Sequence, residues 1–474
     1  MKTLFWMRLK FFKLYLVALL GSLEVSMATA AESPHPNILL IVADDMGWAD
    51  VGYHGSGIKT PHIDRLAREG VELDQFYVAP MCTPTRAALL TGRYWSRFGN
   101  TTPSNERVLP WDTWTLARAL KDAGYSTKIT GKWHLGSKPE WGPRQFGFDR
   151  SHGSLAGGVN PLNHLYKHGQ YSKTWHRDDQ LVEEQGHATD LIGAQAVRFI
   201  ETAEKKGEPF FVYVPFTAVH TPFDEPQKWL DGASQVHPDR QQYAACAQHM
   251  DAMIGEMVAA LDRTGQRENT LIIFFSDNGG TNGDDSNRYP DTRVKGKIRG
   301  MNTPLRGWKT QVYEGGIRVP ALVNWPAKLK PKKVSKPLHV IDWMPTLCGL
   351  LEITEQKGAR WDGVDIWPTL KGENDPVVAS RELYWQGVHN RSAALRQGDW
   401  KLIVHRAKGR GRLELFDLAA DPNEKRDLSS EQSARATAMS KSLAAQEARD
   451  SDELPTDVRQ HILISEEQDA APKP

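Results

Sequence analysis

The chain has 474 residues, too many for one compact core, and this length predicts a large domain with a smaller one attached. With 25% charged and 40% hydrophobic residues, its composition is that of an ordinary folded globular protein. A formal net charge of +1 gives no electrostatic case for nucleic acid or an anionic membrane as a partner, so a polyanionic ligand would need a locally basic pocket.

Residues 1–31 have the pattern of a secretory signal peptide. Basic residues between Lys2 and Lys13 precede the apolar run Leu14–Leu20, and Ala28-Thr29-Ala30 offers small residues for cleavage. The apolar run is too short to span a bilayer, and no later segment is long and apolar enough. We expect an exported protein, periplasmic or extracellular, with no integral membrane span in its mature form. An uncleaved anchor is the alternative.

After this leader, short apolar runs alternate with amphipathic patterns, which are typical of strands and helices. The expected strands are residues 38–43, 126–130, 210–214, 271–275 and 319–323. The expected helices between them are residues 61–69, 115–123, 188–205, 241–262 and 342–351. This alternation predicts an α/β fold in which a large, mainly parallel or mixed sheet lies between layers of helices.

Near residue 375 the pattern changes to closely spaced short strands, at 382–385, 392–396, 400–404 and 412–416, and a helix over about 430–449. We therefore predict a main domain over residues 35–375, a smaller C-terminal α+β subdomain with an antiparallel sheet over 376–450, and a polar tail over 451–474.

Only three cysteines occur, Cys82, Cys246 and Cys348, so the chain is not built on a disulfide framework. Cys246 and Cys348 lie in apolar helical patterns and are expected to be buried hydrophobic residues. The residues leave open a bridge between these two cysteines but give no argument for one.

Polar and titratable residues follow four of the expected strands. They are, in chain order, Asp44 and Asp45, Lys132 and His134, His220, and Asp277 and Asn278. In open α/β sheets, ligand sites form outside the carboxyl ends of the strands. We therefore expect these side chains to meet at one edge of the sheet.

Four of these residues, Asp44, Asp45, Asp277 and Asn278, offer only oxygen ligands. Hard divalent cations prefer such a set, whereas zinc prefers histidine and cysteine. A single Asp-Asp pair is more often a solvated turn or a helix cap. Two acidic strand ends at one sheet edge are stronger evidence for a metal site.

The segment Met81–Arg93 has the most specific pattern in the chain. Cys82 opens a short helix, with Pro84 in its first turn, Arg86 one turn further on and Gly92 as a stop. The free N–H groups at such a helix start favour an anion. The spacing resembles the Cys-x-Pro-x-Arg-x-x-x-Leu-Thr-Gly signature of the formylglycine-dependent type I sulfatases, which are arylsulfatase-like members of the alkaline phosphatase superfamily. A small buried hydrophobic residue that opens an ordinary helix is the alternative.

The resemblance covers residues 36–428 and includes Ala-Asp-Asp-x-Gly at 43–47 and Ser-Asp-Asn-Gly at 276–279. It implies a bound calcium ion, with magnesium as the second choice. The implied ligands are Asp44, Asp45, Cys82, Asp277 and Asn278. It also implies that Cys82 is oxidised to formylglycine, which makes a formylglycine-generating maturation enzyme a required partner.

The same resemblance implies the chemistry at Cys82. One hydroxyl of a formylglycine hydrate attacks sulfur, and the other later loses its proton so that sulfate is expelled, which divides covalent catalysis into two easier steps. Arg86, one turn along the helix, is implied to face the hydrate and the metal.

Four further residues take their roles from the resemblance. Lys132 is implied to bind a sulfate oxygen and His134 to take the hydrate proton, although Thr130 departs from the small or aliphatic residue expected before Gly131-Lys132. His220 and Lys309 match the histidine and lysine that contact the sulfate, and either can protonate the leaving oxygen. For each, an ordinary structural or solvated side chain is the alternative.

Substrate selection is expected to depend on the loops at 100–110, 153–177 and 281–303. Some sulfatases place a serine or histidine on the sulfate after a Gly-Phe-Asp segment, and the residues that follow this segment here are Ser151, His152 and Ser154. His164, His168 and His176 lie in a loop-like stretch with Trp175 and are expected to be solvated loop histidines. Lining the mouth of the substrate site is the alternative.

The residues and the resemblance together predict an exported sulfatase that hydrolyses an aryl or carbohydrate sulfate monoester, so its partner is a sulfated small molecule or glycan. A phosphonate monoester hydrolase or phosphodiesterase of the same fold is the enzymatic alternative. An inactive sulfated-glycan-binding protein is the alternative of another class.

Overall fold

The computed structural model describes residues 35–204, 206–284, 289–292, 297–354, 359–407 and 410–451. The predicted signal peptide and nearly all of the predicted tail lie outside these residues. Within these ranges, none of the helices has both the length and the apolar character needed to cross a membrane.

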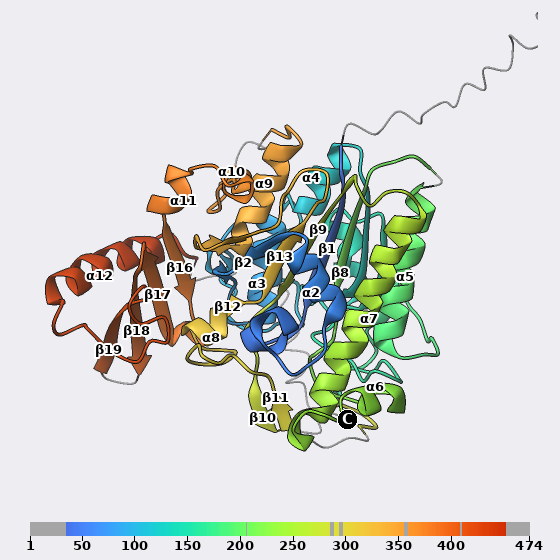
Figure 1. Ribbon diagram of the computed structural model, residues 1–474, viewed down its shortest axis with the longest axis horizontal. Coiled ribbons are helices and arrows are strands. Elements are labelled where there is room, and N and C mark those ends of the chain that lie inside the picture. The colour runs from blue at the N-terminus through green and yellow to red at the C-terminus, as the bar shows by residue number, and fades with distance from the viewer. Residues whose placement is uncertain are drawn as a thin grey trace, which may run out of the picture. The chain divides into compact units, whose positions relative to one another are not determined.

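A ten-stranded mixed sheet runs through the centre of the described chain (Figure 1). Its strands are, in spatial order, β14 (Lys332–Val334), β2 (Val71–Leu73), β13 (Ala321–Asn324), β9 (Thr270–Ser276), β1 (Asn37–Ala43), β8 (Phe210–Pro215), β4 (Ser126–Lys132), β5 (Arg150–Ser154), β6 (Trp175–Arg177) and β7 (Gln180–Leu181). The five strands from β9 to β5 run parallel, whereas β13 and β6 are antiparallel to their inner neighbours. The predicted mixed α/β sheet is confirmed.

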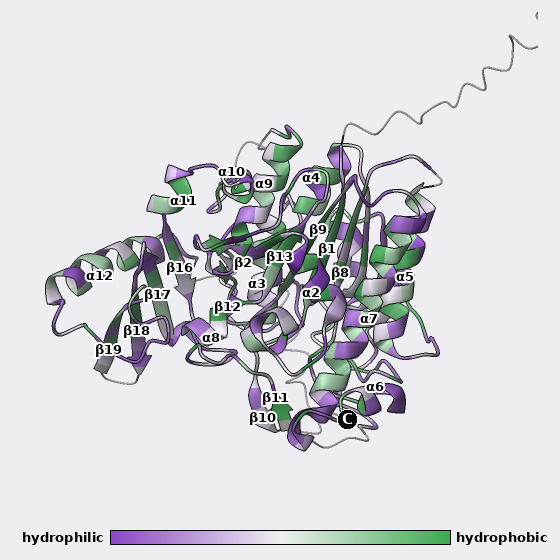
Figure 2. Ribbon diagram, in the orientation of Figure 1, coloured by the Kyte–Doolittle hydropathy of each residue, from purple (hydrophilic) through white to green (hydrophobic). Residues whose placement is uncertain are grey.

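Helices cover both faces of this sheet, because its central strands are apolar on both sides (Figure 2). Along β1, Leu40 packs into one core and its neighbour Ile41 into the other. One face is covered by α2 (Pro61–Arg68), α5 (Ala188–Glu204) and α7 (Gln241–Arg263), of which α5 and α7 lie side by side in Figure 1. The other face is covered by α3 (Cys82–Thr91), α4 (Leu116–Asp122) and α9 (Trp343–Leu350).

The predicted strand over 319–323 was wrong as a single element. Pro320 separates β12 (Arg318–Val319) from β13, and the two strands join different sheets. β12 pairs with β3 (Phe76–Tyr77), which also pairs with β15 (Leu338–His339). The physical reason is that proline has no N–H to donate to a strand ladder, so the chain changes sheet there.

The remaining elements are short. They are the strands β10 (Asn282–Asp284) and β11 (Lys297–Arg299), the helices α6 (Gln227–Gly232), α8 (Glu314–Ile317), α10 (Trp367–Lys371) and α11 (Pro376–Ser380), and 3₁₀ turns at Trp48–Asp50, Gly52–His54, Trp95–Phe98, Pro139–Trp141, Pro143–Phe146, Pro238–Arg240, Val340–Asp342 and Val388–Asn390.

The C-terminal region forms the expected small antiparallel sheet. Its strands are β16 (Glu382–Gln386), β17 (Ser392–Gln397), β18 (Trp400–Ala407) and β19 (Arg410–Asp417), each paired with the next. Helix α12 (Ser433–Glu447) packs along this sheet (Figure 1). The boundary between residues 375 and 376 stays a prediction.

A buried ion cluster joins this small sheet to the main domain. The Lys401 Nζ on β18 lies 2.9 Å from Glu314 Oε1 and 2.9 Å from Glu424 Oε1, and all three side chains are buried. Burial and then the charge of Glu314 raise the pKa of Glu424 to about 7. Burial also acts to raise the pKa of Glu314, but the charge of Lys401 holds that pKa below its ordinary value. One ammonium thus holds two carboxyl groups together away from water.

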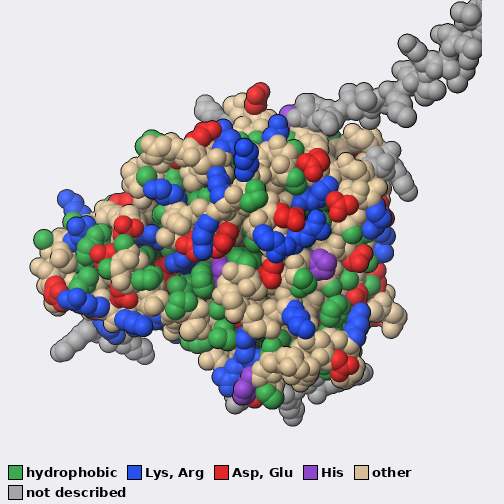
Figure 3. All heavy atoms as spheres, in the orientation of Figure 1, with side chains coloured by type: hydrophobic (Ala, Val, Ile, Leu, Met, Phe, Trp, Pro, Cys, Tyr) green, Lys and Arg blue, Asp and Glu red, His purple; other side chains and the backbone are tan. Residues whose placement is uncertain are grey.

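All three cysteines are buried, and none of them forms a disulfide bond. Cys246 lies in the core on the α7 side of the sheet and Cys348 in the core on the α9 side, so a bridge between them is excluded. On the face seen in Figure 3, basic and acidic side chains are interspersed, in keeping with the near-zero net charge.

Candidate active site

The ends of β1 and β9 bring the predicted acidic residues together. The two strands are parallel neighbours with Ala43 beside Ser276, so both chains leave the sheet at one edge. Asp45 has a φ of 65°, a left-handed conformation that turns the chain out of its strand. Its N–H donates to Asp277 Oδ1 at 3.2 Å, and Asn278 Nδ2 donates to Asp45 Oδ1 at 2.8 Å.

Two lysines approach the same carboxylates. Lys132 is the last residue of β4, and its Nζ lies 2.6 Å from Asp44 Oδ2 in a fully buried ion pair. Lys309 lies in a loop. Its own backbone N–H donates to Gly280 O at 3.2 Å, and its side-chain Nζ lies 2.5 Å from Asp45 Oδ1. Each of the paired aspartates therefore has its own cation.

Helix α3 delivers Cys82 and Arg86 to this edge. Cys82 is its first residue, every residue of the helix is buried, and Gly92, at a φ of 67°, ends it. One turn after Cys82, the Arg86 guanidinium donates to Asp277 Oδ2 at 2.7 and 3.2 Å and to Lys132 O at 2.6 Å. Arg86 thus ties three parts of the site, α3, the end of β9 and the end of β4, to one another.

The thiol of Cys82 is only 3% exposed and lies within electrostatic reach of Lys132, Lys309, Asp277 and Asp44. Burial raises its pKa above the ordinary value, although the two lysines act in the opposite direction. A thiol with a raised pKa keeps its proton at neutral pH and is a weak nucleophile. The unmodified side chain is therefore poorly suited to attack an ester itself.

His134 follows β4 and has a left-handed φ of 57°. Its N–H donates to Leu155 O at 3.0 Å, and its buried Nδ1 has no hydrogen-bond partner among the described residues. Gly157 packs directly against the His134 imidazole. A Cβ added to Gly157 would lie only 2.4 Å from His134 Nε2, so no side chain fits between them. Burial and then the charge of Lys132 lower the pKa of His134 well below its ordinary value, so the ring is neutral and can accept a proton.

His220 is held beside the end of β1, because Val219 N–H donates to Asp44 O at 2.8 Å. The His220 Nδ1 lies 2.6 Å from Thr221 O, and a carbonyl only accepts, so Nδ1 donates and Nε2 faces Asp45 Oδ2 at 3.8 Å. Burial lowers the pKa of His220 to about 3, although the charge of Asp45 acts in the opposite direction. Its side chain is 20% exposed, so a ligand can reach it.

The oxygen atoms left over at this edge fit a hard divalent cation. Asp44 Oδ1 and Asn278 Oδ1 are buried, and neither has a hydrogen-bond partner in the described part of the chain. Asp44, Asp45 and His220 also offer ligand atoms that all lie within 4.8 Å of one another. Carboxylate and amide oxygens are the ligands that calcium prefers. Burial and then the charge of Asp277 raise the pKa of Asp44 to about 8, although the charge of Lys132 acts in the opposite direction.

The structure thus brings all ten predicted site residues to one sheet edge, whereas their individual roles stay predictions. The residues after Gly-Phe-Asp do not join the cluster, because Ser151, His152 and Ser154 bind Asp178, Glu184 and Ala156 instead. The expectation of solvated histidines was wrong for His164 and His176, which are 3% and 1% exposed and pack under the loop. His168 is exposed as expected.

One aromatic residue beside the site was missed. Tyr289 is 6% exposed, and its hydroxyl oxygen lies 2.6 Å from where a Cβ of Gly158 would stand. The same Cβ would be 3.5 Å from His220 Nδ1, so Tyr289 and His220 flank one glycine. Burial raises the pKa of Tyr289, and the charges of Asp44 and Cys82 act on it in the same direction. Tyr289 belongs to no motif or periodic pattern, so only the loop 281–303 as a whole was marked by the sequence.

The wound mixed sheet, the small antiparallel sheet and the charged cluster at the strand ends define the class of this protein, the alkaline-phosphatase-like fold of the sulfuric ester hydrolases. Comparison with protein families agrees. Residues 36–353 match the sulfatase family, and residues 307–449 match the C-terminal region of N-sulphoglucosamine sulphohydrolase.

Relatives of known name cover most of the chain. It is 34% identical to mouse arylsulfatase J over 82% of this chain and 66% of that protein, just under two thirds of the relative's length. It is 33% identical to mouse N-acetylgalactosamine-6-sulfatase, over 79% of this chain and 73% of the relative. It is 31% identical to N-acetylgalactosamine-6-O-sulfatase of Bacteroides thetaiotaomicron, over 85% of this chain and 92% of the relative.

Solved structures agree with these relatives. The crystal structure of Ps i-CgsB superposes with a TM-score of 0.78 at 32% identity, over 88% of this chain and 94% of that one. A sulfatase structure from Bacteroides fragilis, at 21% identity and a TM-score of 0.70, supports the fold alone. The chain belongs to the sulfatase family.

Proposed function

We propose that this sulfatase is exported and hydrolyses a sulfate monoester on a carbohydrate by cleaving the S–O bond. The observation that carries the proposal is the grouping of Arg86, Lys132 and Lys309 around the first residue of α3, beside an oxygen-lined cation site. Such a grouping compensates the charge of a bound sulfate and of its transition state. The names of the relatives, two of which are N-acetylgalactosamine sulfatases, support a carbohydrate as the substrate.

The proposal includes one modified residue, formylglycine at Cys82, and one bound metal ion, calcium. A formylglycine hydrate at Cys82, made by a maturation enzyme, would supply a nucleophilic oxygen that the buried, protonated thiol does not offer. A calcium ion would be held by Asp44, Asp45, Asp277, Asn278 and the modified Cys82, and would supply positive charge to the sulfate oxygens.

The charged side chains of the chain itself orient the sulfate. Lys132 and Lys309 offer ammonium groups to its oxygens, and their pairing with Asp44 and Asp45 holds both side chains in place before the substrate arrives. Arg86 acts through Asp277 and the carbonyl of Lys132, so it positions two other residues.

Two histidines move protons in this proposal. His134 is neutral and its buried Nδ1 has no partner among the described residues, so it accepts a proton from the group at position 82. His220 keeps its Nδ1–H on Thr221 O and presents Nε2 to the site, so it hands a proton to the leaving oxygen only from its doubly protonated form, in which Nε2 also carries a hydrogen. Lys309 is the second group that can do so.

The proposal is tested by incubating the matured protein with 4-nitrophenyl sulfate and with phenyl phosphonate monoesters. We expect release of nitrophenol from the sulfate at a kcat/KM at least tenfold above that for the phosphonate. A monoanionic sulfate suits one divalent cation with two lysines. Faster turnover of the phosphonate would assign the protein to the phosphonate hydrolases. Binding of sulfated glycans by protein shown to carry the aldehyde, without any sulfate release, would assign it to the inactive binders.

Removal of calcium is expected to lower stability as well as activity. After dialysis against a chelator, the Asp44, Asp45 and Asp277 carboxylates face one another without a divalent cation, so we expect a lower Tm. Calcium at about 100 times its Kd restores roughly 2.7 kcal/mol of stability. Magnesium restores less, because it prefers to keep its own waters. The measurement is the Tm with chelator, with calcium and with magnesium.

The matched control for this experiment is Asn278→Ala, which removes one amide oxygen from the proposed ion. The calcium-induced rise in Tm should shrink in this variant. A Tm that stays the same with chelator and with excess calcium, in the unaltered protein, would contradict the metal site.

A further inference from the structure

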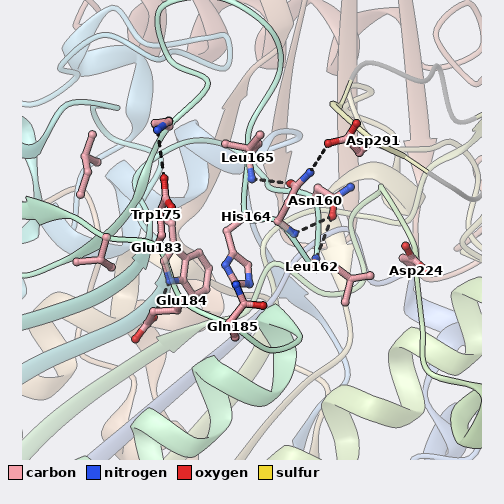
Figure 4. Close-up of a pocket in the computed structure, with 14 residues that line it drawn as sticks. Asn160, Leu162, His164, Leu165, Trp175, Glu183, Glu184, Gln185, Asp224 and Asp291 are labelled. Atoms are coloured by element: carbon pink, nitrogen blue, oxygen red, sulfur yellow. Dashed lines mark hydrogen bonds and ion pairs between the residues drawn. The ribbon is translucent and has the colours of Figure 1, made fainter.

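A cavity of about 720 Å³ lies along the loop from Asn160 to Gln185. Its volume is in the range of sites that bind small molecules. Figure 4 shows His164 and Trp175 in its middle and Asp224 and Asp291 on the side of Asn160. None of these residues belongs to the ten that form the charged cluster.

Three separate segments connect this cavity to the catalytic cluster. Gly157 and Gly158 pack against His134 and His220, and the same segment reaches the cavity two residues later at Asn160. His220 itself begins a segment that reaches the cavity at Asp224. At Asn160 and Asp224 the cavity lining is therefore two residues from Gly158 and four residues from His220 along the chain.

The third segment runs from Tyr289 to Asp291. Asn160 Nδ2 donates to Pro290 O at 3.0 Å, and Asn163 Nδ2 donates to Asp291 Oδ2 at 3.2 Å. These bonds hold the segment of Tyr289 against the cavity wall. Tyr289, which flanks Gly158 beside His220, is thus two residues from Asp291 in the cavity lining.

The lining of the cavity is polar and acidic. Four carboxylates, Glu183, Glu184, Asp224 and Asp291, stand against one lysine, Lys173. Lys173 pairs with Glu183 at 3.2 Å, and Glu184 is paired with Arg177, a residue outside the lining. The neighbouring catalytic cluster instead balances three cations, Arg86, Lys132 and Lys309, against three carboxylates.

The cavity also has apolar surface. Leu162 and Leu181 are 37% and 45% exposed, and Leu165 and Val182 also line the cavity. Apolar side chains cover the C–H face of a sugar ring, and carboxylate and amide groups bind its hydroxyls. This mixture suits an uncharged sugar better than an aliphatic or an anionic ligand.

We propose that this cavity binds the sugar unit next to the sulfated one, and that its carboxylates select an unsulfated neighbour over one that carries a second sulfate. The inference rests on the proposed sulfatase function and adds a substrate class to it. A second sulfate within several ångströms of these carboxylates, of which Glu183 and Asp291 are exposed, meets like charge, which weakens binding about tenfold.

The test uses two matched disaccharides, N-acetylgalactosamine 6-sulfate linked to galactose and the same compound with a second sulfate on the galactose. Their Kd values are measured by calorimetry on the calcium-loaded Cys82→Ala protein, which is proposed not to hydrolyse them. We expect the monosulfated compound to bind about tenfold more tightly. In the further variant Glu183→Gln/Asp291→Asn, this ratio should fall to about threefold or less.

The control is Glu256→Gln, which neutralises an exposed carboxylate on α7 outside the cavity and should leave the ratio unchanged. Equal binding of the two compounds, tighter binding of the disulfated one, no binding of either at millimolar concentration, or a ratio that the double variant leaves unchanged would each overturn the proposal. Turnover of 4-nitrophenyl sulfate by the unaltered protein is measured separately. Its failure would remove the sulfatase function, whereas its success beside an unselective cavity would remove only this inference.

Discussion

Cys82→Ala is expected to abolish sulfate release, with a fall in kcat on the order of 10⁴-fold or more, as when other catalytic nucleophiles are removed. The fold should survive, because the substitution removes only one buried sulfur atom from the start of α3 and leaves the Arg86–Asp277 pair in place. The measurements are sulfate release, the Tm, and the mass of the peptide that contains residue 82. In the unaltered protein that peptide should have the mass of the aldehyde.

Cys246→Ala is the matched control, since Cys246 is also a free, buried cysteine but lies in the core under α7. It should lose a little stability and keep its activity. Appreciable turnover by Cys82→Ala would exclude residue 82 as the source of the nucleophile. A peptide that carries only unmodified cysteine in an active preparation would exclude formylglycine.

Lys401→Met is expected to cause the largest loss of stability, about 3–5 kcal/mol in the free energy of unfolding. Lys401 is the cation shared by Glu314 and Glu424, and its loss leaves two buried carboxyl groups facing each other. Denaturation by urea measures the change. Because Glu314 opens α8, five residues after Lys309, we expect activity to fall as well.

Two further variants separate charge from packing at this cluster. Lys401→Met/Glu424→Gln removes one carboxylate together with the cation and should recover at least half of the lost stability. Lys441→Met, at an exposed position on α12, should change the free energy of unfolding by less than about 0.5 kcal/mol. If Lys401→Met alone costs less than about 1 kcal/mol, the cluster does not join the two sheets as inferred.

Much of the fold could be predicted because its central strands are short, apolar and buried on both faces. β1, β8 and β9 lie within a residue of their expected bounds, and α7 spans 241–263 where 241–262 was expected. Short edge strands such as β6 and β7 were not predicted, since two or three residues carry no periodicity. The division at Pro320 was missed because the apolar run on both sides hides the change of sheet.

The candidate site was predictable for a related reason. Most of its residues follow strand ends or lie one helical turn apart, so local spacing and the rule for parallel sheets group them, whereas Lys309, which lies in a loop, was identified only through the family resemblance. Their pairing was not predictable. The positions of these residues in the sequence do not show that Lys132 pairs with Asp44 and Lys309 with Asp45. Each pair joins segments from distant parts of the chain.

By itself, the sequence determined the class of fold, the edge of the sheet where the site lies and the cysteine at the start of α3, since each depends on residues close together in the chain. Only the tertiary structure decided that Tyr289 flanks His220, that Lys401 joins the small sheet to α8 of the main domain, and that a cavity lined by carboxylates lies near the catalytic cluster. These features depend on contacts between segments that lie far apart in the chain. Their positions are set by packing against the rest of the molecule.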